Sequence, residues 1–352
     1  MDGELIFLST YSLAKDESVQ VLKQILKKEE ELVQFTKAIP EEIQIIEMPT
    51  IFKFKSEKIN IKNKTYDVKV QLALYNIGDI SIRLRINFTN EEELEFLNEN
   101  EDEIKGKLIE KIIKELNNKL ISLNDKLTEE KEEYKIFALN CLPEKVNRKW
   151  LAGLLLKEKN WNNLSKQYVD HSLQRKLSYL KNEVVYVDWD GMIIIGENNY
   201  EEEIIVCEIA NVQLLELRLY NDLMDNFLTN LIKEIKKNQG ILSILLYRRR
   251  LEKLSEEISR FYDDLQEILN KIDNAFSSFG DWYLAKLYSL FSESFRLKDW
   301  KYNITSNLEV IDTISTFIQN KVTNSVNESL EWIIILLIVV EIILEILKFV
   351  KL

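Results

Sequence analysis

Histidine, cysteine, glycine and proline are all scarce in this chain, and their scarcity excludes several kinds of functional site. His171 is the only histidine among the 352 residues, so a Ser-His-Asp triad or a Cys-His pair would depend on this one residue, and one copy of the chain cannot form a histidine-rich metal site. The 8 glycines form neither a P-loop nor a Gly-x-Gly-x-x-Gly turn, which argues against a dedicated nucleotide site. We therefore expect no enzymatic activity, no cofactor and no metal site.

Charge and cysteine content limit the choice of partner and compartment. The formal net charge of −12 and the pI near 5.0 argue against nucleic acid as a partner, because phosphate binding requires a basic face. Cys141 and Cys207 are far apart in the sequence and form no motif. The N-terminus carries no apolar stretch typical of a signal peptide, so we expect the bulk of the chain to face the reducing cytoplasm.

Residues 1–145 have the pattern of an α+β domain. Alternating or β-branched runs predict strands, whereas apolar residues at helical spacing, such as Ile104, Leu108 and Ile112, predict helices. Thr89-Asn90-Glu91-Glu92 fits a capping box that opens the second long helix. The predicted strands cover residues 4–12, 43–54, 66–75, 80–88 and 134–139, and the predicted helices cover residues 16–37 and 91–120. This order indicates helices packed on a mostly antiparallel sheet, with one wet face at the strand 80–88.

Residues 146–200 read as a connector that contains a β-hairpin. Residues 184–187 and 192–195 are rich in valine and isoleucine, and Asp188-Trp189-Asp190-Gly191 lies between them as a turn. The Asp-x-Asp-Gly pattern is also found in calcium loops, but this turn lacks the remaining acids of such a loop. Asp and Gly are what a tight turn requires, so we favour a plain turn.

Residues 201–327 predict a helical stalk or bundle, with coiled-coil-like packing. Apolar residues recur at helical spacing throughout, and Gly240 and Gly280 mark breaks between long helices. Tyr247-Arg248-Arg249-Arg250 is the dense cationic cluster of this region. Arg248, Arg249 and Arg250 could contact lipid headgroups or a phosphate-bearing partner. The alternative is a solvated helix face whose arginines pair with nearby glutamates.

Residues 328–352 are almost wholly apolar and predict a C-terminal transmembrane helix. A membrane span needs about 20 mainly apolar residues, and the stretch from Trp332 to Val350 has that length. Glu341, Glu345 and Lys348 interrupt it and fall on one helical face, which predicts a polar seam between subunits. The alternative is an apolar helix that caps a soluble bundle and turns its glutamates to water.

The tail from Leu330-Glu331-Trp332 through Ile333-Ile334-Ile335-Leu336-Leu337-Ile338-Val339-Val340 to Glu341 and Glu345 resembles the C-terminus of a known family. In the family named for proteins required for meiotic nuclear division, Leu-Glu-Trp precedes an isoleucine-rich membrane segment. The stretch Ala210-Asn211-Val212-Gln213-Leu214-Leu215-Glu216-Leu217-Arg218 is similar to the long helix that comes before that segment. The resemblance implies a membrane-associated, homo-oligomeric protein without established catalysis.

Together these patterns predict a membrane-anchored, homo-oligomeric scaffold with an unknown protein partner. Glu331 and Trp332 would lie at the membrane interface, and the bulk of this single-pass protein would face the cytoplasm. A first alternative is a cation channel or transporter subunit with an acidic ring in the membrane. A second alternative is an enzyme with an unrecognised site in the α+β domain.

Overall fold

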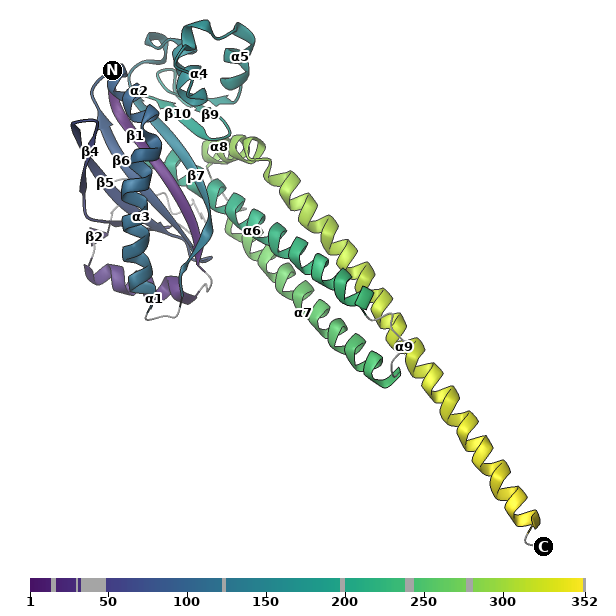
Figure 1. Cartoon of the computed structure of the whole chain (residues 1–352). Coiled ribbons are helices and arrows are strands. Elements are labelled where there is room, and N and C mark those ends of the chain that lie inside the picture. Colours follow the sequence, from purple (N-terminus) through teal and green to yellow (C-terminus); the bar gives the residue numbers. More distant parts are fainter. Residues whose placement is uncertain are drawn as a thin grey trace. The chain divides into compact units, whose positions relative to one another are not determined.

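A computed structural model describes residues 1–13, 17–29, 31–32, 49–121, 125–196, 200–237, 244–276 and 281–350 (Figure 1). The chain divides into two compact units. The first, called here the α/β unit, comprises residues 1–219 and 271–300, and the second, the helical unit, comprises residues 220–270 and 301–352. The N-terminal sheet with its helices, followed by a helical region, agrees with the coarse expectation from the sequence.

A single sheet dominates the α/β unit. Its strand order is β2-β3-β5-β6-β1-β7-β10-β9-β8, and β4 pairs separately with β5. The pairs are antiparallel except for the parallel pair of β7 and β10. The sheet is formed by β1 (Asp2–Leu13), β2 (Glu31–Leu32), β3 (Thr50–Lys53), β4 (Glu57–Ile61), β5 (Lys64–Leu74), β6 (Asp79–Phe88), β7 (Leu127–Asn140), β8 (Lys176–Leu177), β9 (Val184–Val187) and β10 (Gly191–Ile195).

The parallel pair of β7 and β10 changes the expected domain boundary. The predicted hairpin is confirmed as the antiparallel pair of β9 and β10. However, β10 also hydrogen-bonds along β7, with Ile193 opposite Phe137. The stretch 146–200, expected as a connector, therefore extends the N-terminal sheet.

The helices follow the predicted order with more breaks than expected. The described helices are α1 (Glu17–Glu29), α2 (Glu91–Glu99), α3 (Glu101–Leu120), η2 (Pro143–Lys145), α4 (Arg148–Leu156), η3 (Trp161–Asn163), α5 (Lys166–Ser172), α6 (Glu201–Lys237), α7 (Ile244–Phe276), α8 (Trp282–Ser294) and α9 (Leu297–Val350). Parts of the predicted helix 16–37 and strand 43–54, and the breaks at Gly240 and Gly280, lie outside the described residues.

The start of α2 shows how local chemistry sets a helix boundary. The Asn90 side chain accepts a hydrogen bond from the Glu93 N–H at 2.9 Å, and the Glu93 carboxylate accepts one from the Thr89 N–H at 2.7 Å. The N-cap is therefore Asn90, one residue later than predicted, and Glu93 reaches back to Thr89 and not to the N–H of the N-cap itself. The expected single helix is interrupted at Asn100, whose side-chain amide donates to the Phe96 carbonyl at 2.7 Å and competes with the backbone pattern.

One face of the sheet packs an apolar core against helices. Leu84 and Ile86 of β6 belong to the same buried cluster as Ile104, Leu108 and Ile112 of α3. These α3 residues recur every fourth position and so form one stripe along the helix, which Figure 1 shows running across this face. Burial of such side chains supplies most of the stabilising free energy of a fold of this kind.

The opposite face of the same strands is covered by α6, and this corrects the prediction of a wet face. Ser81 and Arg83 alternate with the apolar residues of β6, yet both are fully buried. Glu208 of α6 is also fully buried and bonds to both of them. The alternation therefore separates an apolar interior from a polar interior, rather than an interior from solvent.

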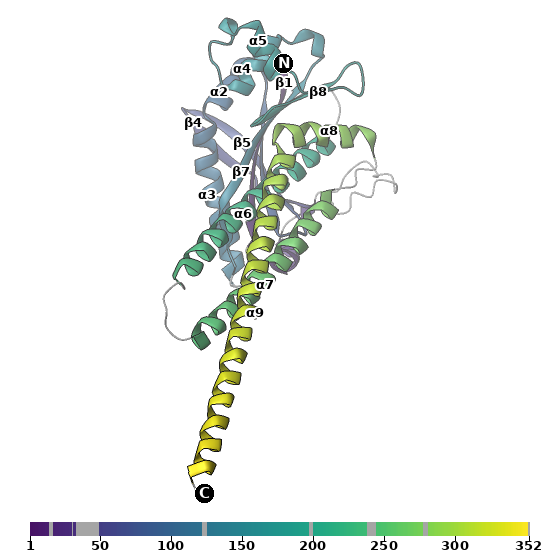
Figure 2. The same ribbon diagram turned by 90° about the vertical axis from the view of Figure 1, so that its right-hand side faces the viewer.

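The helical unit consists of the C-terminal part of α6, most of α7 and the greater part of α9. Figures 1 and 2 both show α6 and α7 side by side, and the rings of Phe227 and Phe261 stack between them with centroids 3.9 Å apart. On α9, a stripe at helical spacing is buried, formed by Ile304, Leu308 and Ile311. Beyond this region α9 runs on past the other two helices (Figure 1).

The predicted C-terminal transmembrane helix is wrong. No helix in the described part of the chain combines the length and the apolar character that a membrane crossing demands. The uninterrupted apolar run covers only residues 332–340, well short of the roughly 20 residues required, and Glu341, Glu345 and Lys348 interrupt the sequence beyond it. The expected tail anchor and the single-pass membrane location are corrected accordingly, and the channel hypothesis depended on the same helix.

Candidate functional site

The residues that the sequence singled out lie on two helices of the chain. Glu331, Trp332, Glu341, Glu345 and Lys348 are part of α9, and their side chains lie outside the described residues. Arg248, Arg249 and Arg250 belong to α7, and their side chains also lie outside the described part. The predicted inter-subunit seam and the predicted phosphate contact therefore stay predictions.

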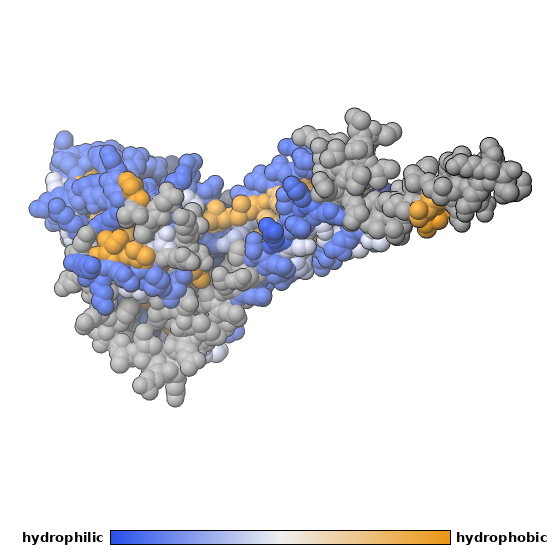
Figure 3. Space-filling view, turned by 90° about the horizontal axis from the view of Figure 1, so that it is seen from below, coloured by the Kyte–Doolittle hydropathy of each residue, from blue (hydrophilic) through white to orange (hydrophobic). Residues whose placement is uncertain are grey.

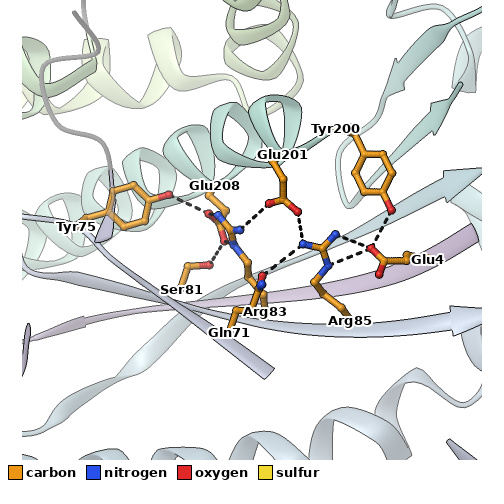
Figure 4. A network of polar contacts seen from close by, with 9 residues as sticks. All are labelled: Glu4, Gln71, Tyr75, Ser81, Arg83, Arg85, Tyr200, Glu201 and Glu208. Atoms are coloured by element: carbon orange, nitrogen blue, oxygen red, sulfur yellow. Dashed lines mark hydrogen bonds and ion pairs between the residues drawn. The ribbon is translucent and has the colours of Figure 1, made fainter. Parts of the chain in front are cut away.

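The most concentrated polar chemistry lies between β6 and α6, within the α/β unit (Figure 4). Arg83 and Glu208 form its centre, and both side chains have no exposed surface. The Arg83 guanidinium donates to the Glu208 carboxylate twice, from Nε at 2.7 Å and from Nη2 at 2.5 Å. This two-point pairing is the geometry in which an arginine and a carboxylate bind each other most strongly.

Glu208 receives two further hydrogen bonds from the sheet. The Ser81 hydroxyl donates to Glu208 Oε1 at 2.8 Å, and the Tyr75 hydroxyl donates to Oε2 at 3.1 Å. Burial, together with the nearby Glu208 charge, holds the pKa of Tyr75 well above its usual range, so this tyrosine stays a donor. Both oxygens of the Glu208 carboxylate therefore accept two hydrogen bonds each. These bonds offset the free-energy cost of burying its charge.

A second arginine extends the network toward the surface. Arg85 donates from Nε at 3.0 Å and from Nη2 at 2.5 Å to Glu4 of β1, and its Nη1 pairs with Glu201 at the start of α6. Tyr200 donates its hydroxyl to Glu4 at 2.8 Å. Figure 4 shows Glu201 between the two arginines, and its second oxygen lies 3.2 Å from Arg83 Nη1.

The pKa values in this network favour fully charged partners. Burial alone would lower the pKa of Arg83, but the Glu208 and Glu201 carboxylates outweigh it and raise the pKa above its ordinary value. For Glu4, burial raises the pKa and Arg85 lowers it, with a net lowering. The pKa shifts of Arg83 and Glu4 therefore favour their charged forms, whereas a general acid or base must exchange a proton near neutral pH.

Two other buried ionisable groups in the α/β unit behave differently. Burial raises the pKa of Glu203 on α6 to about 7, while the Tyr283 hydroxyl, which donates to it at 3.2 Å, opposes the rise. Burial lowers the pKa of Lys135 on β7, whose Nζ lies 3.8 Å from Glu101 and makes no hydrogen bond in the described structure. Both groups are candidates for proton-linked behaviour, because their environments favour the neutral form.

Sequence reasoning missed all of these residues. Arg83 and Glu208 are 125 positions apart, and no spacing rule connects a strand to a helix over that distance. The one available signal was an arginine at alternate positions in an otherwise strand-like run. Within the described ranges, no group of three His, Cys, Asp or Glu side chains has the arrangement of a metal site.

Comparisons with known proteins place the α/β unit in a family. Residues 2–201 match the sequence model of a family described as "Uncharacterized protein MJ0711, N-terminal domain". A protein of Methanocaldococcus jannaschii with the name "Uncharacterized protein MJ0711" is 25% identical over 285 residues, which cover 73% of this chain and 86% of that protein. No solved structure matches the chain. The family match does not reach the C-terminal tail, so the resemblance of that tail to the meiotic nuclear division family stays untested.

The matched residues include the sheet and the start of α6. Arg83, Arg85, Glu4 and Glu201 all fall within residues 2–201, whereas Glu208 lies just beyond them. The match covers more than half of the chain. The chain therefore belongs to the family of the MJ0711 N-terminal domain.

Proposed function

We propose that this protein is a non-catalytic, homo-oligomeric interaction protein that self-associates through α9. The observation that carries the proposal is a stripe of exposed apolar side chains on that helix, formed by Val310, Phe317 and Ile335, which are 46%, 52% and 49% exposed. Single exposed apolar residues are ordinary on a protein surface, but several that share one face of a helix mark a contact site.

The spacing of this stripe supports a helical partner. Val310 and Phe317 are seven residues apart, the repeat of a coiled-coil seam, and Ile335 follows after eighteen residues, or about five helical turns. All three therefore fall on one face of α9. The buried stripe of Ile304, Leu308 and Ile311 lies on another face, so α9 has one apolar row for its own unit and one that remains exposed.

A second copy of the same chain is the simplest partner for such a row. In a two-fold dimer each copy supplies the same patch, so exposed apolar residues on one face of a helix can contact their own counterparts. Further along α9, Ile334, Leu337 and Ile338 are also exposed, and Figure 3 shows hydrophobic side chains on the surface near that end of the helix.

The buried network of Arg83 and Glu208 supports a non-catalytic protein. Its charges are committed to each other and closed to solvent, whereas a catalytic group must reach a substrate. This arrangement fixes α6 on the sheet and gives the α/β unit a rigid structure, as a binding protein requires.

The test is a mass measurement by sedimentation equilibrium on the full chain. The wild type is expected to form a defined oligomer at micromolar concentration, and Val310→Glu with Phe317→Glu is expected to give a monomer with an unchanged helical circular dichroism signal. The matched control is Leu223→Glu, which changes a side chain of equal exposure (53%) on α6 and should keep the oligomer. A monomeric wild type, or equal dissociation by the control, would refute the proposal.

A further inference from the structure

A cavity of about 260 Å³ lies in the α/β unit, between the α2–α3 segment and the α4–η3 segment. Its lining includes the two indoles of Trp150 and Trp161, the amide of Asn98, and the carboxylates of Glu95, Asp102 and Glu158. It is separate from the network of Arg83 and from the stripe on α9. Drug-sized ligands usually occupy about 300–1,000 Å³, so this cavity suits a smaller molecule.

The end of α4 builds one wall of the cavity. Lys157 adopts a left-handed backbone conformation with φ 52°, and the Glu158 N–H donates to the Gly153 carbonyl at 2.9 Å, which reverses the chain. Trp161 is thereby brought back against the helix. A Cβ at position 153 would lie only 2.4 Å from the Cβ of Trp161, so the close approach of the indole requires glycine there.

The other indole holds a carboxylate at the cavity. Trp150 is almost fully buried, and its Nε1 donates to Glu95 Oε1 at 2.7 Å. This hydrogen bond fixes the Glu95 carboxylate next to an aromatic ring. Indole faces attract cations, and a neighbouring carboxylate adds to that attraction.

The remaining charges leave an excess of negative charge around the cavity. Two lysines also line it, but Lys159 pairs with Glu99 at 2.9 Å and Lys157 pairs with Glu101. Across the described ranges, Glu95, Asp102 and Glu158 have no ion pair with a cationic side chain. The cavity is therefore matched to a positively charged guest.

Asn98 also lines the cavity, and one of its polar atoms is buried without a partner among the described residues. Its side chain is only 5% exposed, and its Nδ2 donates to the Leu154 carbonyl at 3.2 Å. Because a carbonyl can only accept, this bond fixes which end of the amide is the oxygen. Asn98 Oδ1 has no hydrogen-bond donor anywhere in the described structure, and a buried acceptor without a donor is costly.

We propose that this cavity binds a small aliphatic primary amine. An ammonium group has three donors and no acceptor, so it suits the carboxylates that line the cavity. The methylene groups of the amine would pack against Trp150 and Trp161. The carboxylates disfavour an anion, and a neutral alcohol would leave their charges without a partner.

The experiment is isothermal titration of the full chain at low ionic strength with 1,4-diaminobutane. Titrations with 1,4-butanediol, which has the same length without charge, and with succinate, which has the opposite charge, are run in parallel. We expect heat of binding with the diamine alone. Asp102→Asn and Glu95→Gln should each weaken diamine binding by roughly tenfold, the size of one charge-assisted hydrogen bond.

The matched control is Glu103→Gln, which makes the same change of charge one residue away from Asp102. Glu103 lies outside this cavity and pairs with Lys107 at 2.6 Å, so diamine affinity should not change. The proposal is overturned if the diol or succinate binds as well as the diamine, if calcium chloride displaces the diamine, or if the control weakens binding equally. The comparison of ligands on the wild type decides the matter even if a variant fails to fold.

Discussion

The two faces of β6 are both buried, but they are stabilised by different interactions. Leu84 faces α3 within an apolar cluster, whereas the adjacent Arg83 faces α6 and pairs with Glu208. Apolar contacts tolerate small changes of shape, since their free energy follows buried area. A buried ion pair has no such tolerance, because removing one partner leaves the other charge in a medium that cannot solvate it.

This difference suggests a division of labour between the two faces. The apolar face supplies stability, while the polar face determines which helix can lie on the sheet and in which register. An α6 shifted by one residue would bring Cys207 or Ile209 to the place of Glu208 and leave Arg83 without its two-point partner. Variants on the polar face and on the apolar face of β6 can separate these two roles.

Replacing Arg83 with methionine should have the largest effect. It leaves the Glu208 charge buried without its guanidinium, and we expect a loss of about 4 kcal/mol in the free energy of unfolding, measured by urea titration. The double variant Arg83→Met with Glu208→Met removes both charges and should recover at least half of that loss. If the double variant is as unstable as the single one, the pair contributes packing and not charge compensation.

Replacing Leu84 with alanine is the matched change on the apolar face. The side chain is fully buried, so the deletion should cost about 3 kcal/mol through lost burial and the cavity left behind. This loss should not depend on salt or on pH between 5 and 8. A salt-dependent loss would show that the two faces are not energetically separate.

Glu203 on α6 should make the stability of the α/β unit depend on pH. Its pKa in the folded state is raised to about 7 by burial, above the value near 4.5 of the unfolded chain. Because the folded state holds the Glu203 proton more tightly than the unfolded chain, protonation of Glu203 stabilises the fold at low pH. This stabilisation is fully present below the unfolded pKa and is lost as the pH rises through 7. Relative to Glu203→Gln, the wild type should therefore lose roughly 2 kcal/mol of stability between pH 5 and pH 8. Parallel stability curves for the two proteins would contradict this assignment.

Tyr200→Phe should have the smallest effect. The variant loses the hydrogen bond from the hydroxyl to Glu4, but that carboxylate keeps two bonds from Arg85. We expect a loss of about 1 kcal/mol in thermal or urea unfolding. A loss as large as that of Arg83→Met would mean that the outer part of the network is as critical as its buried centre.

Much of the fold could be predicted from the sequence, because it follows local patterns. The antiparallel pair of β9 and β10 was visible in two valine- and isoleucine-rich runs around a turn of Asp and Gly. The stripe of α3 was visible in apolar residues at every fourth position. These signals come from residues that are close together in the sequence, so no tertiary information was needed.

The errors came from contacts between distant segments. The polar positions of β6 were assigned to solvent, because Glu208 is remote in sequence and gave no hint of covering them. The tail was assigned to a membrane on its apolar residues, although Glu341, Glu345 and Lys348 interrupt the run. The cavity beside Trp150 could not be foreseen, since it depends on the reversed chain after Lys157.

The sheet ends on one side in β8, a strand of only two residues, Lys176 and Leu177. A long free edge offers a row of unpaired backbone groups to any other strand, which is how folded proteins become joined into fibres. Here the edge presents too little backbone to template a neighbour, and the longer strands β9 and β10 lie behind it. Two copies of this chain that meet along this edge could form very few backbone hydrogen bonds between their sheets. Association through β8 should therefore stay weak even at high protein concentration.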